Sequence, residues 1–503
     1  MSLAIPDADQ KLSYDCLKCV LQRLEVNFRF RLAERLPEIN LTEKAAPLYI
    51  SRLSITVDGF QLNDTKYKLG VILQAREGPN PEKINSDNRK GGSPRDIDRF
   101  GFEKYSLPEL TPGDILIQDF DPEMYMDDDD LESVEARVLK TWNMLTDLER
   151  HKMEIEQASE EELENIPEYQ IEVDPEEGVL VEIYQEEDDD LMEIEQELEN
   201  ILERPVNIEP DQLDRARSRE ERLEKVHKDI RYLKRELEYE ELDLQRYQCK
   251  RDNLPSPFDM FIQLTTTSPG GTVYIERFNY DNTLHEARKY LICKFLGNRP
   301  MVTKIRSLSF WAWLDEGLVV GLPDGIKLDV QEFKTSGNLS EVLQRVEPIL
   351  EHPNRPFTRL ESDRFKLEDA QNPKVRDARV LELINTTRVE FMELYREITN
   401  KKVVIHFSRG LFPEEYVMIV ENLVDIKGTL GTCYEITQWR HSTAREAMNA
   451  IAQRFQNSVK GERLVTIPLP QQLQLDVSYE ENLTQPGREL WTMKMEVVRS
   501  RIN

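Results

Sequence analysis

The sequence predicts a mixed α/β protein whose C-terminal half is a sheet covered by helices. Three observations support this prediction. Short β-branched runs alternate with helical periodicity between residues 401 and 455, and the same alternation runs through residues 302–385. A strongly acidic segment, residues 121–210, separates this half from strand patterns nearer the start. Strands that alternate with amphipathic helices imply either an open α/β sheet or a degenerate solenoid.

Residues 401–455 show the alternation most clearly. A β-branched strand is expected at residues 402–407 and a second strand at residues 432–437. Pro413 suits the first turn of the helix between these strands, and Gly428 suits its end. One face of that helix is apolar, with Tyr416, Ile419, Val420, Leu423 and Val424, and the next helix places Ala447, Ile451 and Phe455 on one face.

Nearly all of the net charge lies in one segment. The chain has 503 residues, enough for two to four domains, and a formal charge of −30. Residues 121–210 contain 33 acidic and 5 basic residues, whereas the remainder is almost neutral. Because such a segment repels phosphates and no basic stripe compensates for it, the composition disfavours nucleic-acid binding. We interpret residues 121–250 as a helical, solvated and partly disordered insertion.

The composition also indicates an intracellular, non-membrane protein. No apolar run is long enough to span a bilayer, and the first ten residues lack the features of a signal peptide. The five cysteines are odd in number and mostly scattered, as is typical of a reducing compartment. We therefore expect a cytoplasmic or nuclear location and no membrane contact.

A small helical module is expected at the N-terminus. An apolar stripe follows the helical repeat, formed by Leu12, Leu17, Val20, Leu21 and Leu24 and continued by Phe28, Leu32 and Leu36 after a turn near Asn27. Cys16 and Cys19 share one helical face, but zinc needs about four ligands and the nearest histidine is His151. We interpret the two cysteines as small residues packed on the helix, and we predict no metal site.

Residues 12–24 resemble the opening of an F-box, and more specifically that of the nematode F-box C proteins, whose shared region is a domain of unknown function. Ser13 stands where an F-box usually has proline, and no tryptophan closes the module. Further resembling segments are residues 43–48, 91–102, 112–114, 251–253, 257–258 and 431–434. The resemblance implies that Leu12, Leu17, Val20, Leu21 and Leu24 bind the Skp-type adaptor of a cullin ubiquitin ligase. It also implies that the α/β region holds a protein substrate.

A non-catalytic scaffold is the alternative function, with the F-box-like helices packed on the protein's own core. Exposure of Leu17, Leu21 and Leu24 would favour docking, and burial would favour the scaffold. Catalysis is not expected, because the six histidines are dispersed and no nucleophile motif occurs. His285 and Glu286 begin like a zinc-protease motif, but Lys289 replaces the second histidine. We predict no cofactor.

The middle of the chain predicts strands, then helices. Residues 51–74 alternate as hairpin strands, and Gly91 and Gly92 permit left-handed backbone without forming a phosphate-binding motif. Residues 223–244 carry two to three heptads, which leaves an intramolecular hairpin and a dimeric coiled coil as alternatives. The acidic runs lack the spacing of a calcium loop. We expect the remainder to fold without residues 125–245.

The pattern returns to strands after residue 261. Trp311 and Trp313 belong to an apolar run, residues 310–314, which predicts either a strand buried on both faces or an aromatic partner site. The predicted organisation is a helical F-box-like module at residues 1–50, a β-rich region at 51–120, the acidic insertion at 121–250, and strand–helix repeats at 251–503. These repeats would form an open sheet or a degenerate leucine-rich-repeat-like solenoid.

Overall fold

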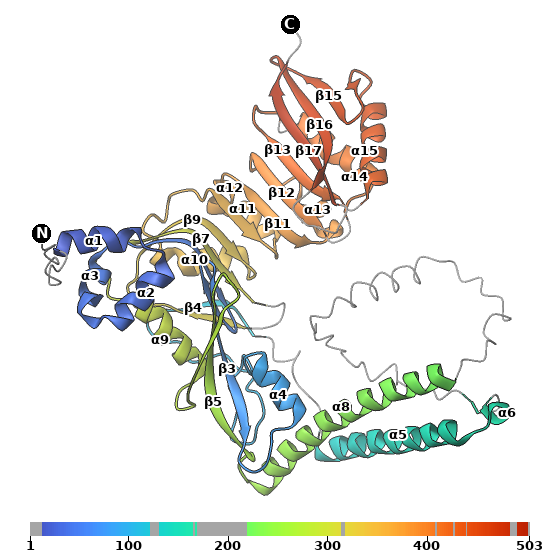
Figure 1. The fold of residues 1–503 in the computed structure, drawn as a ribbon. Coiled ribbons are helices and arrows are strands. Elements are labelled where there is room, and N and C mark those ends of the chain that lie inside the picture. The colour runs from blue at the N-terminus through green and yellow to red at the C-terminus, as the bar shows by residue number, and fades with distance from the viewer. Residues whose placement is uncertain are drawn as a thin grey trace, which may run out of the picture.

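The computed structural model describes residues 13–120, 130–163, 166–167, 219–312, 317–407, 410–425, 428–438, 440–482 and 490–500. Within these ranges the chain forms a mixed α/β fold around one open sheet of 15 strands, as expected from the sequence (Figure 1). The strand order is β14-β15-β16-β17-β13-β12-β11-β10-β9-β7-β1-β2-β3-β5-β6. The N-terminal half therefore continues the same sheet as the C-terminal repeats.

The centre of the sheet is parallel. Its strands are β1 (Tyr49–Thr56), β7 (Thr303–Trp311), β9 (Leu328–Thr335), β10 (Arg359–Ser362), β11 (Leu381–Thr386), β12 (Lys402–Phe407) and β13 (Cys433–Gln438). From β9 to β13 each strand lies beside the next one in the chain, because each connection crosses back through helices on one side.

Antiparallel strands extend the sheet at both ends. One end holds β2 (Gly59–Leu62), β3 (Thr65–Ala75), β5 (Phe258–Thr267) and β6 (Val273–Asn279). The other end holds β14 (Val459–Lys460), β15 (Leu464–Leu469), β16 (Leu473–Asn482) and β17 (Leu490–Arg499). A separate pair is formed by β4 (Asp114–Gln118) and β8 (Leu318–Gly321).

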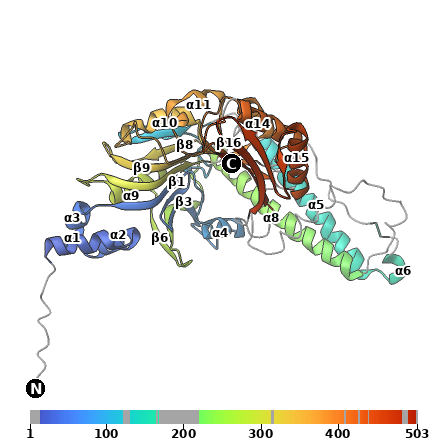
Figure 2. The same cartoon turned by 90° about the horizontal axis from the view of Figure 1, so that it is seen from above.

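Helices cover one side of the parallel strands. Figure 2 shows α10, α11 and α14 in a layer along one side of the curved sheet. The helices of this region are α9 (Leu284–Leu296), α10 (Leu339–Val346), α11 (Leu367–Gln371), α12 (Pro373–Arg376), α13 (Arg388–Leu394), α14 (Pro413–Asp425) and α15 (His441–Arg454), with 3₁₀ turn η4 (Glu347–Ile349). The apolar face predicted for α14 is buried, since Tyr416, Ile419, Val420 and Leu423 are all fully covered.

The insertion contains an antiparallel helical hairpin, which settles the alternative left by the heptads. Helix α5 (Leu131–Gln157) packs along α8 (Arg219–Asp252), and α6 (Glu160–Leu163) lies at the far end (Figure 1). The hairpin has its own core, which includes Leu148 and Leu233. The base of α8 differs, because Leu242 belongs to the main core of the sheet. Removal of residues 125–245 would therefore delete a side chain of the main core. The spacing of Leu191, Ile194, Leu198 and Ile201 predicts a further helix of the insertion, which lies outside the described residues.

One smaller expectation needs correction, and another is confirmed. The turn in the N-terminal module lies at Leu24 and Glu25, and Asn27 is instead a buried residue of the second helix. Gly92 adopts positive φ, at 80°, and a Cβ there would lie 2.4 Å from the carbonyl oxygen of Val71, so glycine is needed at this position for both reasons. The glycine pair thus permits a close crossing of the backbone over β3.

Candidate protein-interaction surface

Four short helical elements form the N-terminal module. They are α1 (Tyr14–Arg23), α2 (Val26–Arg35), 3₁₀ turn η1 (Pro37–Ile39) and α3 (Asn40–Ala45). Ser13 caps α1 by accepting a hydrogen bond from the Cys16 backbone N–H at 3.3 Å. Glu25 caps α2 in the same way from Phe28 at 3.0 Å. Each cap provides a hydrogen-bond acceptor for a backbone N–H in the first turn of its helix, which has no partner within the helix.

The module has a small core of its own, and the predicted binding stripe lies mainly in it. Leu21 is fully buried among Ala33, Ile39 and Ala46. Leu17 and Leu24 pack against this cluster and are half-buried. Of the residues predicted to bind the adaptor, Val20 is the one that is exposed among those the structure describes, at 44%. Leu12 lies outside the described residues.

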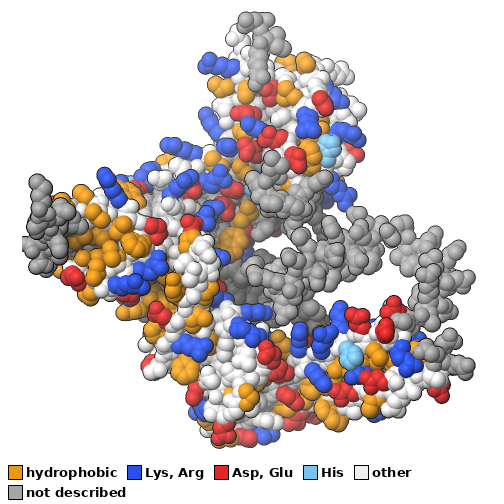
Figure 3. All heavy atoms as spheres, viewed as in Figure 1, with side chains coloured by type: hydrophobic (Ala, Val, Ile, Leu, Met, Phe, Trp, Pro, Cys, Tyr) orange, Lys and Arg blue, Asp and Glu red, His pale blue; other side chains and the backbone are white. Residues whose placement is uncertain are grey.

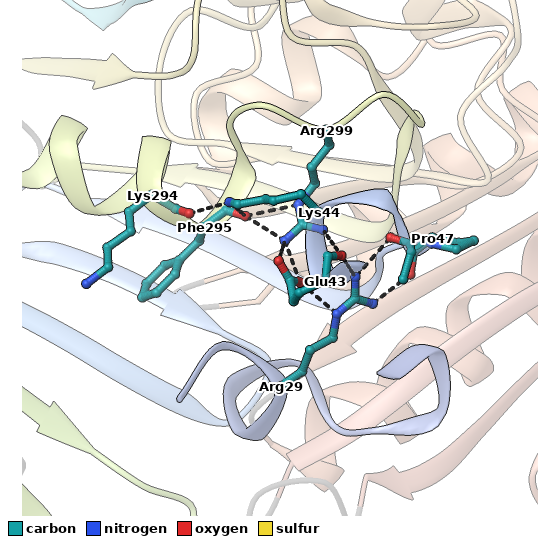
Figure 4. Close-up of polar contacts among 8 residues, drawn as sticks. Arg29, Glu43, Lys44, Pro47, Lys294, Phe295 and Arg299 are labelled. Carbon is teal, nitrogen blue, oxygen red and sulfur yellow. Dashed lines mark hydrogen bonds and ion pairs between the residues drawn. The ribbon is translucent and has the colours of Figure 1, made fainter. Parts of the chain in front are cut away.

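A buried ionic network joins the module to the sheet (Figure 4). The Glu43 carboxylate of α3 accepts hydrogen bonds from Arg29 of α2 at 2.7 Å and from Arg299, which follows α9, at 2.8 Å. All three side chains are at most 3% exposed. Arg29 also donates to the carbonyl oxygens of Pro47 and Ala46. One carboxylate thus holds two guanidinium groups that are far apart in the chain.

Lys44 extends the network. Its ammonium group donates to the carbonyl oxygens of Lys294 and Phe295 at the end of α9. Burial, together with the charge of Arg299, lowers the pKa of Lys44 to about 8. The carbonyl groups at a helix C-terminus attract a cation, so this contact also caps α9.

Apolar and neutral polar contacts reinforce the attachment. The rings of Phe30 and Phe295 stack with centroids 4.8 Å apart. Asn27 donates to the Leu62 carbonyl at 2.9 Å and accepts from the Tyr67 hydroxyl at 2.9 Å. Because these contacts reach β2, β3 and α9, the module is held in a defined orientation on the sheet.

The outer side of the module exposes apolar side chains. We call this the module surface and define it by Tyr14, Val20, Phe28, Leu36 and Leu41, which are between 40% and 85% exposed. Figure 3 shows hydrophobic side chains gathered over the module at the left of the molecule. Sequence periodicity identified the helices, but it did not show which apolar residues face outward.

A second candidate surface is the side of the parallel sheet opposite the helices. Ser309 of β7, Lys334 of β9, Glu361 of β10 and Glu382 of β11 occupy one row across neighbouring strands. Parallel sheets usually carry helices on both faces, so a polar row of this kind is uncommon. A hollow of about 1000 Å³ lies at the end nearest the module, lined by Glu25, Arg31, Arg52, Arg306, Glu332 and Lys334 among others.

Ion pairs cross the polar row from strand to strand. Lys334 pairs with Glu361, Arg359 with Glu382, and His406 contacts Glu382 at 3.1 Å. Burial alone would raise the pKa of Glu382, but hydrogen bonds from His406 and Arg359 outweigh it and lower the pKa to about 2. The row is therefore a nearly charge-balanced surface suited to polar contacts.

The remaining predicted site residues do not converge. Trp311 is half-buried at the end of β7 beside the fully buried Phe310, and Trp313 lies outside the described residues. Cys16 and Cys19 are exposed thiols, which corrects the expectation that they pack on the helix. Lys289 binds Asp114 at 2.9 Å, beside His285.

The described residues offer neither a metal site nor a membrane-spanning helix. They contain no cluster of three or more metal-ligating side chains. Nor does any helix among them have the length and apolar character needed to cross a bilayer.

Fold and surfaces together define an α/β protein built on one long open sheet with a helical module fixed near one end. A family model described as a domain of unknown function (DUF3557) matches residues 283–438. That range runs from the start of α9 to the end of β13, so it covers most of the parallel sheet with its helices and omits the N-terminal module. No curated protein and no solved structure matches significantly.

Proposed function

We propose that this protein is a non-catalytic interaction subunit of the F-box type. The N-terminal module would bind the Skp-type adaptor of a cullin ubiquitin ligase, and the polar side of the sheet would hold a protein substrate. The proposal combines the resemblance of residues 12–24 to an F-box with the geometry of the module. In this proposal the two partners bind different parts of the molecule.

The observation that carries the proposal is the exposed module surface on an anchored module. Leu41 is 85% exposed, Phe28 49% and Val20 44%. Grouped exposed apolar side chains in a monomer mark sites of protein contact. The Arg29–Glu43–Arg299 network fixes this surface relative to the sheet. A module anchored in this way suits a subunit that holds one partner at a set distance from another.

The structure changes which residues would make the contact. A partner cannot reach Leu21, which is fully buried in the module's own core. Leu17 and Leu24 contribute to the same cluster. We therefore assign docking to the module surface, which shares Val20 with the residues predicted to bind the adaptor and Phe28 and Leu36 with the continuation of the apolar stripe.

The scaffold function remains a second candidate, and one observation favours it. Burial of Leu21 together with partial burial of Leu17 and Leu24 is the result expected if the helices pack on the protein itself. Val26 and Phe30 of α2 also belong to the core of the sheet. In that case the module would serve mainly to shield the apolar core of the sheet from solvent, next to Val26 and Phe30.

Binding of a purified Skp-type adaptor distinguishes the two functions. We expect Val20→Asp and Leu41→Asp each to weaken adaptor binding by about one to two orders of magnitude, because a carboxylate would enter an apolar contact and about 1.4 kcal/mol corresponds to a tenfold change. Both side chains are exposed, so the melting temperature should change little. Isothermal titration calorimetry and thermal unfolding would measure the two effects.

The matched control is Val389→Asp, because Val389 is 61% exposed on α13, away from the module. It should leave adaptor binding unchanged. A folded, unmodified protein that shows no adaptor binding would favour the scaffold. Equal loss of binding in the control and in the module variants would also contradict docking through the module surface.

A further inference from the structure

Strand β6 is an unprotected edge of the long sheet. Among the residues that the structure describes it pairs only with β5, and all seven of its own residues are exposed. Natural edge strands are usually short, covered, or interrupted by proline, lysine or a bulge, because free backbone groups invite pairing with another chain. The opposite edge follows this rule, since β14 has two residues. Strand β6 has no proline, lysine or bulge, and its charged side chains are Glu276 and Arg277.

The hairpin geometry shows which backbone groups of β6 point outward. The Ser268 N–H donates to the Thr272 carbonyl at 2.9 Å across the turn, so Thr272 directs its groups toward β5. Hydrogen-bonding direction alternates along a strand. Val273, Ile275 and Arg277 therefore present their N–H and C=O groups away from β5.

The side chains of β6 are exposed to solvent, like the backbone groups on its outer edge. Val273, Tyr274, Ile275 and Phe278 are between 49% and 54% exposed. They occupy both faces of the strand, and β-branched and aromatic residues favour cross-strand packing. These side chains would therefore be more stable packed against another strand than exposed to solvent.

We propose that β6 pairs antiparallel with β6 of a second copy of this chain, about a two-fold axis at Ile275. A two-fold axis perpendicular to the sheet leaves the side chain of a given residue on the same face in both copies. Residues that pair directly across the two strands must also share a face, so the residue at the axis pairs with its own copy. Full overlap, centred on Glu276, opposes two carboxylates. A centre at Arg277 opposes two guanidinium groups.

The register centred on Ile275 gives the longest overlap in which no two like charges lie opposite each other. It places Ile275 opposite Ile275, Tyr274 opposite Glu276, and Val273 opposite Arg277. The three outward-facing residues then exchange backbone hydrogen bonds across the seam. The pairing would join the two 15-stranded sheets edge to edge. This inference does not depend on adaptor binding.

We expect a weak dimer. A seven-residue strand offers less contact area than a stable dimer usually buries. Association should therefore depend on protein concentration, with a Kd on the order of micromolar. Sedimentation velocity over a concentration series measures it directly.

The first variant is Ile275→Pro, which removes an outward N–H that β5 does not use. Proline is tolerated at such an edge position, so the melting temperature should remain close to that of the unmodified protein. Dimerisation should be lost. Ile275→Thr, which keeps the N–H and a β-branched side chain, should retain concentration-dependent association and serves as the matched control.

Cysteine cross-linking tests the register. In a background with Cys16→Ser and Cys19→Ser, Ile275→Cys places two thiols on the axis at a Cα separation of about 5.5 Å, which suits a disulfide. Oxidation should yield a linked dimer from this variant and none from Glu276→Cys. A chain that stays monomeric to about 100 µM and does not cross-link at position 275 overturns the proposal. Preferential cross-linking at position 276 overturns the register.

Discussion

Glu43 shows how one side chain can decide the placement of a module. Its carboxylate faces Arg29 and Arg299, and all three groups are almost completely buried. Burial lowers the pKa of both arginines, and the charge of Glu43 opposes that effect. Such a network contributes specificity of position more than net stability, because desolvation offsets much of the Coulomb attraction.

We predict that Glu43→Ala destabilises the protein by about 3–5 kcal/mol, since it leaves two guanidinium groups buried without their carboxylate. Urea denaturation would measure the change in the free energy of unfolding. The control is Glu34→Ala, which removes an exposed pair with Lys294 and should cost at most about 1 kcal/mol. Equal effects of the two changes would show that the buried network does not anchor the module.

Asp363 is a second residue whose environment has a measurable consequence. It follows β10 at its carboxyl end, and its Oδ1 atom is buried without a hydrogen-bond partner. Burial is the main cause that raises its pKa from 3.8 to about 6, and the neighbouring Arg364 opposes the shift. The folded protein therefore binds this proton more tightly than the unfolded chain does.

The stability contributed by Asp363 should consequently rise as the pH falls from about 6 toward 3.8. We predict that Asp363→Asn stabilises the protein by about 1 kcal/mol above pH 7 and flattens the pH dependence within that window. Denaturation curves at several pH values would test this. Asp377→Asn, at an exposed carboxylate, is the control, and a steeper pH dependence in Asp363→Asn would contradict the prediction.

At the scale of elements, the α5–α8 hairpin is an independent unit joined to the sheet at its base. Its core residues, among them Leu145, Leu148, Val226 and Ile230, form a cluster separate from the main core. At the base, Thr141 of α5 donates to Glu240 of α8 at 3.0 Å, and Leu242 enters the main core. The base of the hairpin therefore packs with the main core of the sheet, whereas its distal part packs only within the hairpin.

We predict that the sheet folds cooperatively when residues 143–237 are replaced by a short glycine–serine linker. The two cut ends lie close together because Thr141 and Glu240 are within hydrogen-bond distance across the hairpin. A single thermal transition near that of the full chain would confirm this. A longer deletion that also removes Leu242 should lower the melting temperature, since it creates a cavity in the main core. Loss of cooperativity in the shorter deletion would contradict the independence of the hairpin.

At the scale of the whole molecule, one sheet contains every strand of the described residues except the β4–β8 pair. Parallel strands form its centre, and antiparallel strands extend it at both ends. The parallel centre is covered by helices on one side and carries the polar row on the other. The module surface and the β6 edge both lie toward the end that contains β1, β2, β3 and β5. Adaptor docking and self-pairing would therefore use different surfaces of the same end of the molecule.

Local sequence pattern determined the elements and their buried faces. The face of α14 and the strand at residues 402–407 were predicted closely, because helical and strand periodicities are properties of neighbouring residues. The strand–helix alternation likewise determined the α/β class. The insertion was recognised because its charge differs so strongly from that of the rest of the chain.

Tertiary structure alone decided what each face packs against. Glu43 meets Arg299 across 256 positions, and no local pattern predicts that contact. Periodicity placed Leu21 and Val20 in one apolar stripe, but packing buried the first and exposed the second. The heptads fitted either a hairpin or a dimer until α5 was found along α8. The free edge at β6 also depends on strand order. Periodicity encodes which side of an element avoids water, whereas the partner that covers it comes from distant parts of the chain.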